Sequence, residues 1–274
     1  MKEWHGNGKR LSYKEVGEGK PLLVLHGTGY DHRSMERLLE PVFEGRPGWR
    51  RLYVDLPGMG ETPAAGFTNS AEIVDALLAF LDERAPGERA ALTGYSFGGY
   101  LLRGIAGLRG VALAGLFFLC PVVGRQRTNL PELRPDPPGE ELLAAMTPDE
   151  ARRFAGKTVT PTLELLERFR ACIFPAQDMA DARFLTGLKR TGGYWLPEEQ
   201  ERGPEQLDVP VGIVCGRQDQ IVGYSDAARL LDQFPHASYA VLDKAGHHAF
   251  LEKETLVRAH FLDWLDRMEA EKAR

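Results

Sequence analysis

The hexapeptide Gly94–Gly99 reads G-Y-S-F-G-G and places Ser96 between small residues. An apolar run, Ala90–Thr93, precedes it and a run typical of a helix follows from Tyr100, which predicts a strand, a sharp turn and a helix. Such a turn exposes the serine hydroxyl at its apex, because the flanking glycines permit strained backbone and close packing of helix on strand. The pattern indicates nucleophilic chemistry at Ser96; the alternative is a turn with a purely structural role.

A base and an acid for Ser96 are expected further along the chain, because a serine hydroxyl is a weak nucleophile at neutral pH. His247, after Gly246, and Asp219, after Gly216, each follow an apolar run that reads as a strand. The carboxyl ends of parallel strands lie along one edge of a sheet, so residues far apart in sequence converge there. The order Ser96, Asp219, His247 is also the order expected after a G-x-S-x-G turn. We therefore predict Ser96 as nucleophile, His247 as base and Asp219 as the acid that orients it.

Three neighbouring features leave alternatives to this assignment. His248 competes with His247, although the small Gly246 predicts a tight turn that directs His247 inward. Asp243 is closer to His247 in sequence, but it ends the terminal strand and cannot easily turn back to the imidazole. Asp219 has the alternative role of capping the next helix or bonding to its own turn.

Acyl transfer also requires N–H donors for the oxyanion of the tetrahedral intermediate. The first donor is expected from Phe97, directly after the serine, and the second from the loop His26–Gly29 that ends the first parallel strand. We predict the N–H of Thr28 for this second role, with Gly29 as the next candidate. The loop contains neither G-x-G-x-x-G nor G-x-x-x-x-G-K-[ST], which disfavours a phosphate-binding function.

The elements that must position these residues alternate between strand and helix, which predicts a mostly parallel sheet with helices on both faces. Gly6-Asn7-Gly8 predicts a tight hairpin turn at the start of the chain. The predicted strands are 2–5, 10–16, 21–25, 51–54, 89–93, 111–120, 209–215 and 238–242. The predicted helices of this part are 32–43, 69–84, the run after Ser96, 225–234 and 254–270.

The composition changes at about residue 124. Residues 124–139 are rich in arginine and proline and predict an irregular connector. Residues 140–203 predict only short helices, at 140–146, 148–155, 161–172 and 178–189. We therefore expect one core domain formed by 1–123 and 204–274, interrupted by a helical insertion at 124–203.

Composition and charge restrict the possible partners. The 274 residues carry a net charge of −5 without a basic block, so we expect no binding to nucleic acid. The N-terminus lacks a signal-like apolar stretch and the longest apolar run, 111–123, is too short for a bilayer, so no membrane association is expected. Three cysteines form no disulfide framework or zinc-binding spacing, which favours the cytoplasm and predicts no metal and no other cofactor.

The motifs in this order resemble the α/β-hydrolase superfamily over nearly the whole length outside the insertion. His26-Gly27 is similar to its oxyanion loop, and 55–60 (DLPGMG) to its D-x-P-G-x-G loop. Residues 94–99 resemble its nucleophile elbow, and Gly216–Asp219 and Gly246-His247 its acid and base positions. The resemblance implies a doubly wound, mostly parallel eight-stranded sheet in which 124–203 form a helical cap over the site.

The resemblance also implies a function: a carboxylesterase-like serine hydrolase acting on a small to medium carboxylic ester or related acyl compound. Serine at the nucleophile position argues against haloalkane dehalogenases and epoxide hydrolases, which use aspartate there. Carbon–carbon bond hydrolysis, lactonase, thioesterase and cofactor-free haloperoxidase activity remain open on the same machinery, as does a ligand-binding receptor. The expected partner is the small-molecule substrate, and a homodimer remains an open alternative to a monomer.

Substrate contacts are expected from the two loops beside Ser96 and from the cap. We predict Gly27, Gly29 and Tyr95 for the loops and Trp195 for the cap. The wider pool of apolar cap residues supplies the cavity wall in part, and most of it is expected to form the cap's own core: Phe154, Phe169, Ile173, Phe174, Met179, Phe184, Leu185, Tyr194 and Trp195.

Overall fold

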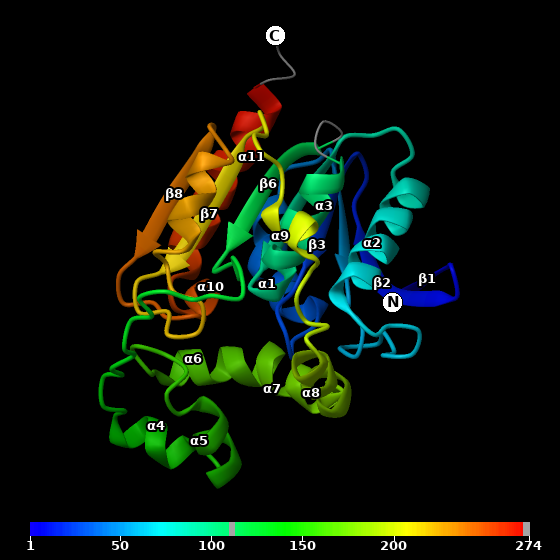
Figure 1. The fold of residues 1–274 in the computed structure, drawn as a ribbon. Coiled ribbons are helices and arrows are strands. Elements are labelled where there is room, and N and C mark those ends of the chain that lie inside the picture. The colour runs from blue at the N-terminus through cyan, green and yellow to red at the C-terminus, as the bar shows by residue number, and fades with distance from the viewer. Residues whose placement is uncertain (110–112, 271–274) are drawn as a thin grey trace.

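A computed structural model describes residues 1–109 and 113–270, in which eight strands form a single sheet (Figure 1). Their order across the sheet is β1-β2-β4-β3-β5-β6-β7-β8. The strands are β1 (Lys2–Gly6), β2 (Lys9–Val16), β3 (Lys20–Leu25), β4 (Trp49–Val54), β5 (Ala90–Tyr95), β6 (Leu113–Leu119), β7 (Val211–Gly216) and β8 (Ala237–Leu242).

The sheet is parallel from β4 to β8, and the β1–β2 hairpin adds two antiparallel strands at one edge. Strands β5 and β7 are buried along their whole length, as expected of apolar strands with helices on both faces. The hairpin turns through Asn7 and Gly8, both with positive φ (52° and 72°), which suits an Asn-Gly pair. These observations confirm the predicted fold class. Residues 111 and 112 of the predicted strand 111–120 lie outside the described residues.

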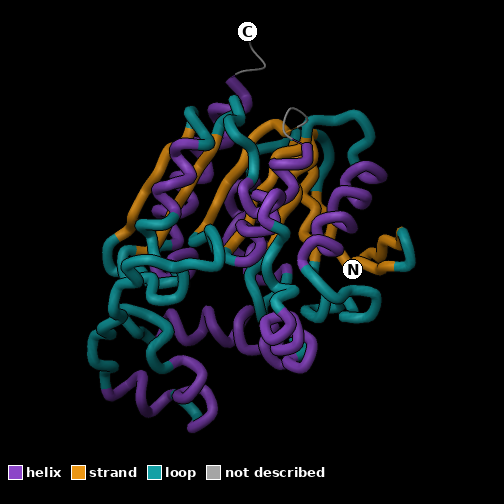
Figure 2. The backbone as a smooth tube through the Cα atoms, viewed as in Figure 1, coloured by secondary structure: helices purple, strands orange, loops and turns teal. Residues whose placement is uncertain are grey.

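Helices cover both faces of the sheet (Figures 1 and 2). Helix α2 packs against α3 on one face, and α1 packs against α11 on the other. The bounds of α1 and α11 agree with the prediction, and the side chain of Asp31 caps the start of α1 by accepting from the Arg33 N–H. The helices of this part are α1 (His32–Phe43), α2 (Ser70–Arg84), α3 (Phe97–Arg109), α10 (Ala249–Glu252) and α11 (Glu254–Ala270).

The predicted helix 225–234 is wrong in type and length. The structure has a short 3₁₀ helix there, η3 (Ala227–Asp232). Directly before it, the carboxylate of Asp226 accepts hydrogen bonds from the backbone N–H (2.8 Å) and the hydroxyl of Thr128. This long-range contact holds the start of the segment to the connector, and local helix propensity does not decide its conformation.

The insertion contributes helices, all but the last of which lie at the carboxyl ends of the strands (Figure 1). The prediction of a break between 172 and 178 is wrong, because α6, a π-helical turn η2 and α7 follow one another directly. The wider turn precedes Pro175, which lacks the N–H that a regular helix would use. The helices are α4 (Glu140–Ala145), α5 (Pro148–Phe154), α6 (Leu163–Arg168), η2 (Phe169–Ile173), α7 (Phe174–Met179), α8 (Ala182–Thr191) and α9 (Glu198–Arg202).

The end of the insertion returns to the sheet before residue 203. Helix α9 packs on α3, and the backbone N–H of Leu196 donates to the hydroxyl of Tyr100 (2.8 Å). The division of the chain at 124 and 203 stays a prediction. None of the helices among the described residues is long and apolar enough to cross a membrane.

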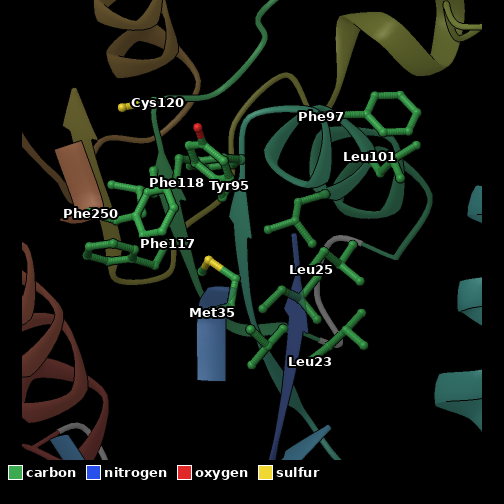
Figure 3. Close-up of a cluster of buried hydrophobic side chains, with 14 of the residues drawn as sticks. Leu23, Leu25, Met35, Tyr95, Phe97, Leu101, Phe117, Phe118, Cys120 and Phe250 are labelled. Atoms are coloured by element: carbon green, nitrogen blue, oxygen red, sulfur yellow. The ribbon is translucent and has the colours of Figure 1, made fainter. Parts of the chain in front are cut away.

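A buried aromatic cluster supports the carboxyl end of β5 (Figure 3). The ring of Tyr95 lies 4.8 Å from that of Phe250, and Phe118 and Cys120 belong to the same cluster. All four side chains are fully buried. The last residues of β5 are therefore held by close packing, which limits their movement.

Candidate active site

Ser96 occupies a strained turn between β5 and α3. Its φ is +52°, a left-handed conformation that non-glycine residues rarely adopt. A Cβ on Gly98 would lie 2.6 Å from the carbonyl oxygen of His26, so only glycine allows this close approach. The Ser96 N–H donates to the carbonyl of Leu119 (2.9 Å), and its carbonyl accepts from Val122 (3.1 Å). The neighbouring strand thus holds the turn on both sides.

His247 lies between Ser96 and Asp219. Its Nε2 is 3.0 Å from the Ser96 Oγ, and its Nδ1 is 2.8 Å from the Asp219 Oδ2. Because an ionised carboxylate only accepts hydrogen bonds, Nδ1 carries the proton and Nε2 is free to accept from the serine hydroxyl. The three side chains have the geometry in which a serine is activated by a histidine and an acid.

Asp219 is fully buried and ionised. Burial opposes its ionisation, but the adjacent His247 and two backbone N–H groups together outweigh burial and lower the pKa of the carboxyl. These N–H groups belong to Ile221 and Val222 and donate to its Oδ1 at 2.9 and 3.0 Å. The carboxylate is therefore fixed in place and remains charged, as an orienting acid requires.

His248 and Asp243, the competing candidates, have other partners. The Nδ1 of His248 donates to the Lys157 carbonyl (2.9 Å), so its Nε2 accepts from the Tyr30 hydroxyl (2.7 Å). Burial lowers the pKa of His248 to about 3, and the imidazole stays neutral. Asp243 is exposed and accepts from the Gln218 side chain (2.8 Å). The structure places neither residue next to Ser96.

The predicted oxyanion donors lie on the expected elements. Phe97 is the first residue of α3, where backbone N–H groups have no partner within the helix. Among the described residues, neither the Phe97 nor the Thr28 N–H donates a hydrogen bond. The N–H of Gly29, the second candidate, is directed to the Met59 sulfur (3.1 Å), which favours Thr28. Their role in binding an oxyanion stays a prediction.

A cavity of about 560 Å³ opens above Ser96 and His247. Its volume is typical of small-molecule sites. The cap supplies part of the wall, including the predicted residue Trp195. The lining residues are Thr28, Tyr30, Ser96, Val122, Arg127, Lys157, Gln177, Lys189, Tyr194, Trp195, Gln220, Ile221, Val222, His247 and His248.

Three residues predicted to contact the substrate are not among those that line this cavity: Gly27, Gly29 and Tyr95. Tyr95 is fully buried beneath the turn, and its hydroxyl donates to the carbonyl of His247 (3.1 Å). A Cβ on Gly27 would lie 2.9 Å from the Tyr95 ring and 3.1 Å from the Ser96 Cβ, so Gly27 allows the two loops to pack. Gly27 and Tyr95 therefore support the site by packing beneath it.

The wall of the cavity contains polar residues that the sequence did not lead us to predict. Of the nine apolar cap residues considered, only Tyr194 and Trp195 line the cavity, and Phe154 and Phe169 pack edge to face in the cap. Polar side chains supply much of the remaining wall: Arg127, Lys157, Gln177, Lys189 and Gln220. Gln220 could have been predicted from the sequence because it directly follows Asp219, whereas the other four residues lie in a segment without a motif.

Cys120 lies beside the acid and base. Its sulfur, an Asp219 oxygen and a His247 nitrogen are all within 4.8 Å of one another. Burial, together with Asp219, raises the pKa of the Cys120 thiol, so it stays protonated, whereas metal binding requires a thiolate. The Asp219 carboxylate is already bound by His247 and two N–H groups. The set therefore fits a metal ion poorly.

Glu252 connects the cap to the His247 turn. Its carboxylate accepts from the Val159 N–H (2.5 Å) in the cap segment and from the Gly246 N–H (2.7 Å) directly before His247. Burial raises its pKa, and the two N–H groups oppose that effect. One half-buried side chain thus bonds both to the cap segment and to the turn that carries His247.

Comparisons with known proteins agree with this architecture. The sequence matches the Alpha/beta hydrolase family over residues 22–259. A crystal structure of an alpha/beta superfamily hydrolase from Oenococcus oeni PSU-1 is 26% identical, with a TM-score of 0.83. The match covers 98% of this chain and 100% of that one.

Two curated relatives are similar over most of their length. A 2-hydroxy-6-oxononadienedioate/2-hydroxy-6-oxononatrienedioate hydrolase of Paraburkholderia phymatum is 27% identical, covering 95% of this chain and 92% of the relative. A pimeloyl-[acyl-carrier protein] methyl ester esterase of Pectobacterium atrosepticum is also 27% identical, covering 88% and 92%. Their names describe different reactions, so similarity at this level leaves the substrate open.

Proposed function

Because the chain belongs to the alpha/beta hydrolase family, we propose that it is a serine hydrolase that cleaves a small to medium carboxylic ester or related acyl compound. The observation that carries the proposal is the hydrogen-bonded series Ser96–His247–Asp219 at the floor of the cavity, with distances of 3.0 and 2.8 Å. The relative named as a methyl ester esterase supports ester chemistry.

The reaction begins when the Ser96 oxygen attacks the substrate carbonyl and His247 Nε2 accepts the hydroxyl proton. The carbonyl electron pair moves onto the oxygen, where the N–H groups of Phe97 and Thr28 stabilise the negative charge. His247 then donates the proton to the leaving alcohol, and the acyl group remains bonded to Ser96. Water, activated by His247, releases the acid and restores the serine.

The buried Asp219 carboxylate holds His247 in the required tautomer and stabilises the imidazolium that forms in each half-reaction. Two backbone N–H groups keep this carboxylate ionised, so it does not take the proton from His247. The proposed steps use only side chains and backbone groups of this chain. No metal or organic cofactor takes part in them.

A second candidate is hydrolysis of a carbon–carbon bond in an oxo acid by the same residues. The relative from P. phymatum, named as a hydrolase of 2-hydroxy-6-oxo acids, favours it. Turnover of a vinylogous 1,5-diketone acid, measured beside that of 4-nitrophenyl esters, separates the two reactions. A higher kcat/KM for the diketone would assign the carbon–carbon reaction.

Replacement of the nucleophile tests the proposal. Ser96→Ala is expected to lower kcat for 4-nitrophenyl butyrate by about 10³-fold or more, because no covalent intermediate forms. Ser238→Ala, at an exposed position of β8, is the matched control and retains activity. A fluorophosphonate probe is expected to label the wild-type protein and the control but not Ser96→Ala. Full activity of Ser96→Ala would refute a serine hydrolase, and absent labelling of folded wild type would favour a ligand-binding receptor.

A further inference from the structure

The cavity wall carries a single sign of charge. Three of its lining residues are basic, Arg127, Lys157 and Lys189, and none of the lining residues is aspartate or glutamate. The whole chain has a net charge of −5, so this local excess is opposite in sign to the molecule. A cavity lined by one sign of charge concentrates ligands of the other sign.

These three cations have no carboxylate partner among the described residues. The Arg127 guanidinium donates to the Ile221 backbone carbonyl (2.6 Å), and the Lys189 ammonium lies 5.9 Å from the centre of the Tyr194 ring. No hydrogen bond or ion pair of the Lys157 ammonium occurs in the described part of the chain. Their charges are thus available to a molecule in the cavity.

Several other arginines of the cap are paired with carboxylates. Arg170 contacts Glu150 (2.6 Å), Arg168 contacts Glu164 (2.7 Å), and Arg153 contacts Asp178 (2.9 Å). None of these three arginines lines the cavity. These pairs neutralise part of the positive charge of the cap away from the cavity, whereas the three cations that line the cavity have no carboxylate partner among the described residues.

The cations surround the reacting residues from three elements. Arg127, in the connector, is bound to Ile221, two residues from Asp219. Lys157 follows α5, and its carbonyl accepts from His248, next to His247. Lys189, on α8, lies near Tyr194, whose ring stacks on Phe97 at 4.5 Å. All three cations line the same cavity as Ser96 and His247.

We propose that the substrate carries an anionic group, a carboxylate in the simplest case, in the part remote from the bond that is cleaved. This inference rests on the proposed serine hydrolase function and specifies its substrate class. Arg127, Lys157 and Lys189 bind the anion, and the side-chain amides of Gln177 and Gln220 supply further polar contacts at the wall. The half-ester of a dicarboxylic acid has this chemistry, with one end reactive and the other end charged.

Matched ester pairs test the inference and distinguish the two ends of the substrate. In the first pair, mono(4-nitrophenyl) adipate is compared with 4-nitrophenyl hexanoate, which places the charge on the acyl side. In the second pair, the hexanoate ester of 4-hydroxybenzoate is compared with the hexanoate ester of 4-hydroxybenzamide, which places the charge on the alcohol side. We expect at least one charged ester to exceed its neutral partner in kcat/KM by about tenfold, mainly through KM, and this ratio to fall as salt is added.

A triple variant, Arg127→Gln, Lys157→Gln and Lys189→Gln, is expected to bring that ratio close to one. The control variant changes three exposed cap arginines that do not line the cavity, Arg152→Gln, Arg183→Gln and Arg190→Gln, and keeps the wild-type ratio. Because each ratio is measured on one protein sample, it does not depend on the fraction that is folded.

The inference would be overturned if the neutral esters were turned over as fast as both charged esters, or if the ratio were unchanged in the cavity variant. That result leaves the proposed function intact if Ser96→Ala still abolishes turnover of the neutral esters. Turnover of all four esters that persists in Ser96→Ala would instead remove the proposed function itself.

Discussion

The floor and the wall of the cavity are built in opposite ways. On the floor, Ser96, Asp219 and His247 are buried and held by hydrogen bonds to backbone or to one another. On the cap side, Lys157 and Lys189 are exposed and have no carboxylate partner among the described residues. Rigid packing suits atoms that must meet at a fixed distance, whereas exposed side chains adapt to the rest of a substrate.

From this contrast we expect the floor to carry out the reaction and the cap side to select the substrate. Changes on the floor are expected to act on kcat, because in the proposed reaction Ser96 and His247 exchange a proton and Asp219 holds His247 in place. Changes on the cap side are expected to act on the choice of substrate. Glu252 joins the two regions, so its replacement affects both.

The largest effect is expected from Asp219→Asn. An amide in place of the carboxylate no longer holds the His247 Nδ1 proton or stabilises the imidazolium, so kcat for 4-nitrophenyl butyrate falls about 10⁴-fold. The matched control is Asp243→Asn at the exposed end of β8, which we expect to change kcat less than about twofold. A loss below about tenfold in Asp219→Asn would show that another acid orients His247.

The pH dependence of stability tests whether His248, which is buried beside His247, stays neutral. Burial lowers the pKa of His248 to about 3 in the folded protein, whereas the unfolded chain takes up the proton near the ordinary value of about 6.5. The unfolded state thus binds more protons below that value, and stability is lost as the pH falls from about 6.5 toward 3. The slope for one such group approaches about 1.4 kcal/mol per pH unit.

Urea unfolding between pH 6.5 and 5 measures this slope in a window above the titration of ordinary carboxylates. His26 is also buried with a lowered pKa, so the wild type loses stability through both residues. His248→Gln removes one of the two contributions, and its slope is expected to be shallower although its stability at pH 7 is lower. Equal slopes in the two proteins would mean that His248 is protonated in the folded state.

The smallest of these effects is expected from Glu252→Gln. The amide offers one oxygen to the two N–H groups of Val159 and Gly246, so one N–H loses its acceptor, at a cost of about 1–2 kcal/mol. We expect kcat to fall several-fold, and hydrogen exchange to accelerate at the amides of both residues. Glu164→Gln, exposed and paired with Arg168, is the control and changes stability by less than about 0.5 kcal/mol. Acceleration confined to one of the two amides would show that Glu252 does not couple cap and floor.

Local patterns account for what the sequence predicted well. The turn at Ser96 and the Asn-Gly hairpin depend on residues that are neighbours in the chain, and glycine is required where φ is positive or backbones meet. Continuous apolar runs likewise predict strands buried on both faces, because no alternation is needed there. The catalytic roles of Ser96, Asp219 and His247 stay predictions, although the structure brings the three within hydrogen-bonding distance.

Long-range packing accounts for the failures. Tyr95 is next to Ser96 in sequence, yet its ring packs against Phe250 in the core and does not line the cavity. The segment 225–234 is set by the contact of Asp226 with Thr128, about a hundred residues away. In neither case does the neighbouring sequence carry the information.

The amino-acid sequence was sufficient for the fold class and for a set of strand-end residues with the chemistry of a serine hydrolase, because both arise from short-range patterns repeated in a known order. The nature of the cavity wall emerged from the folded chain alone. Arg127, Lys157 and Lys189 come from three separate segments without a common motif, and their shared orientation depends on how the cap packs over the sheet.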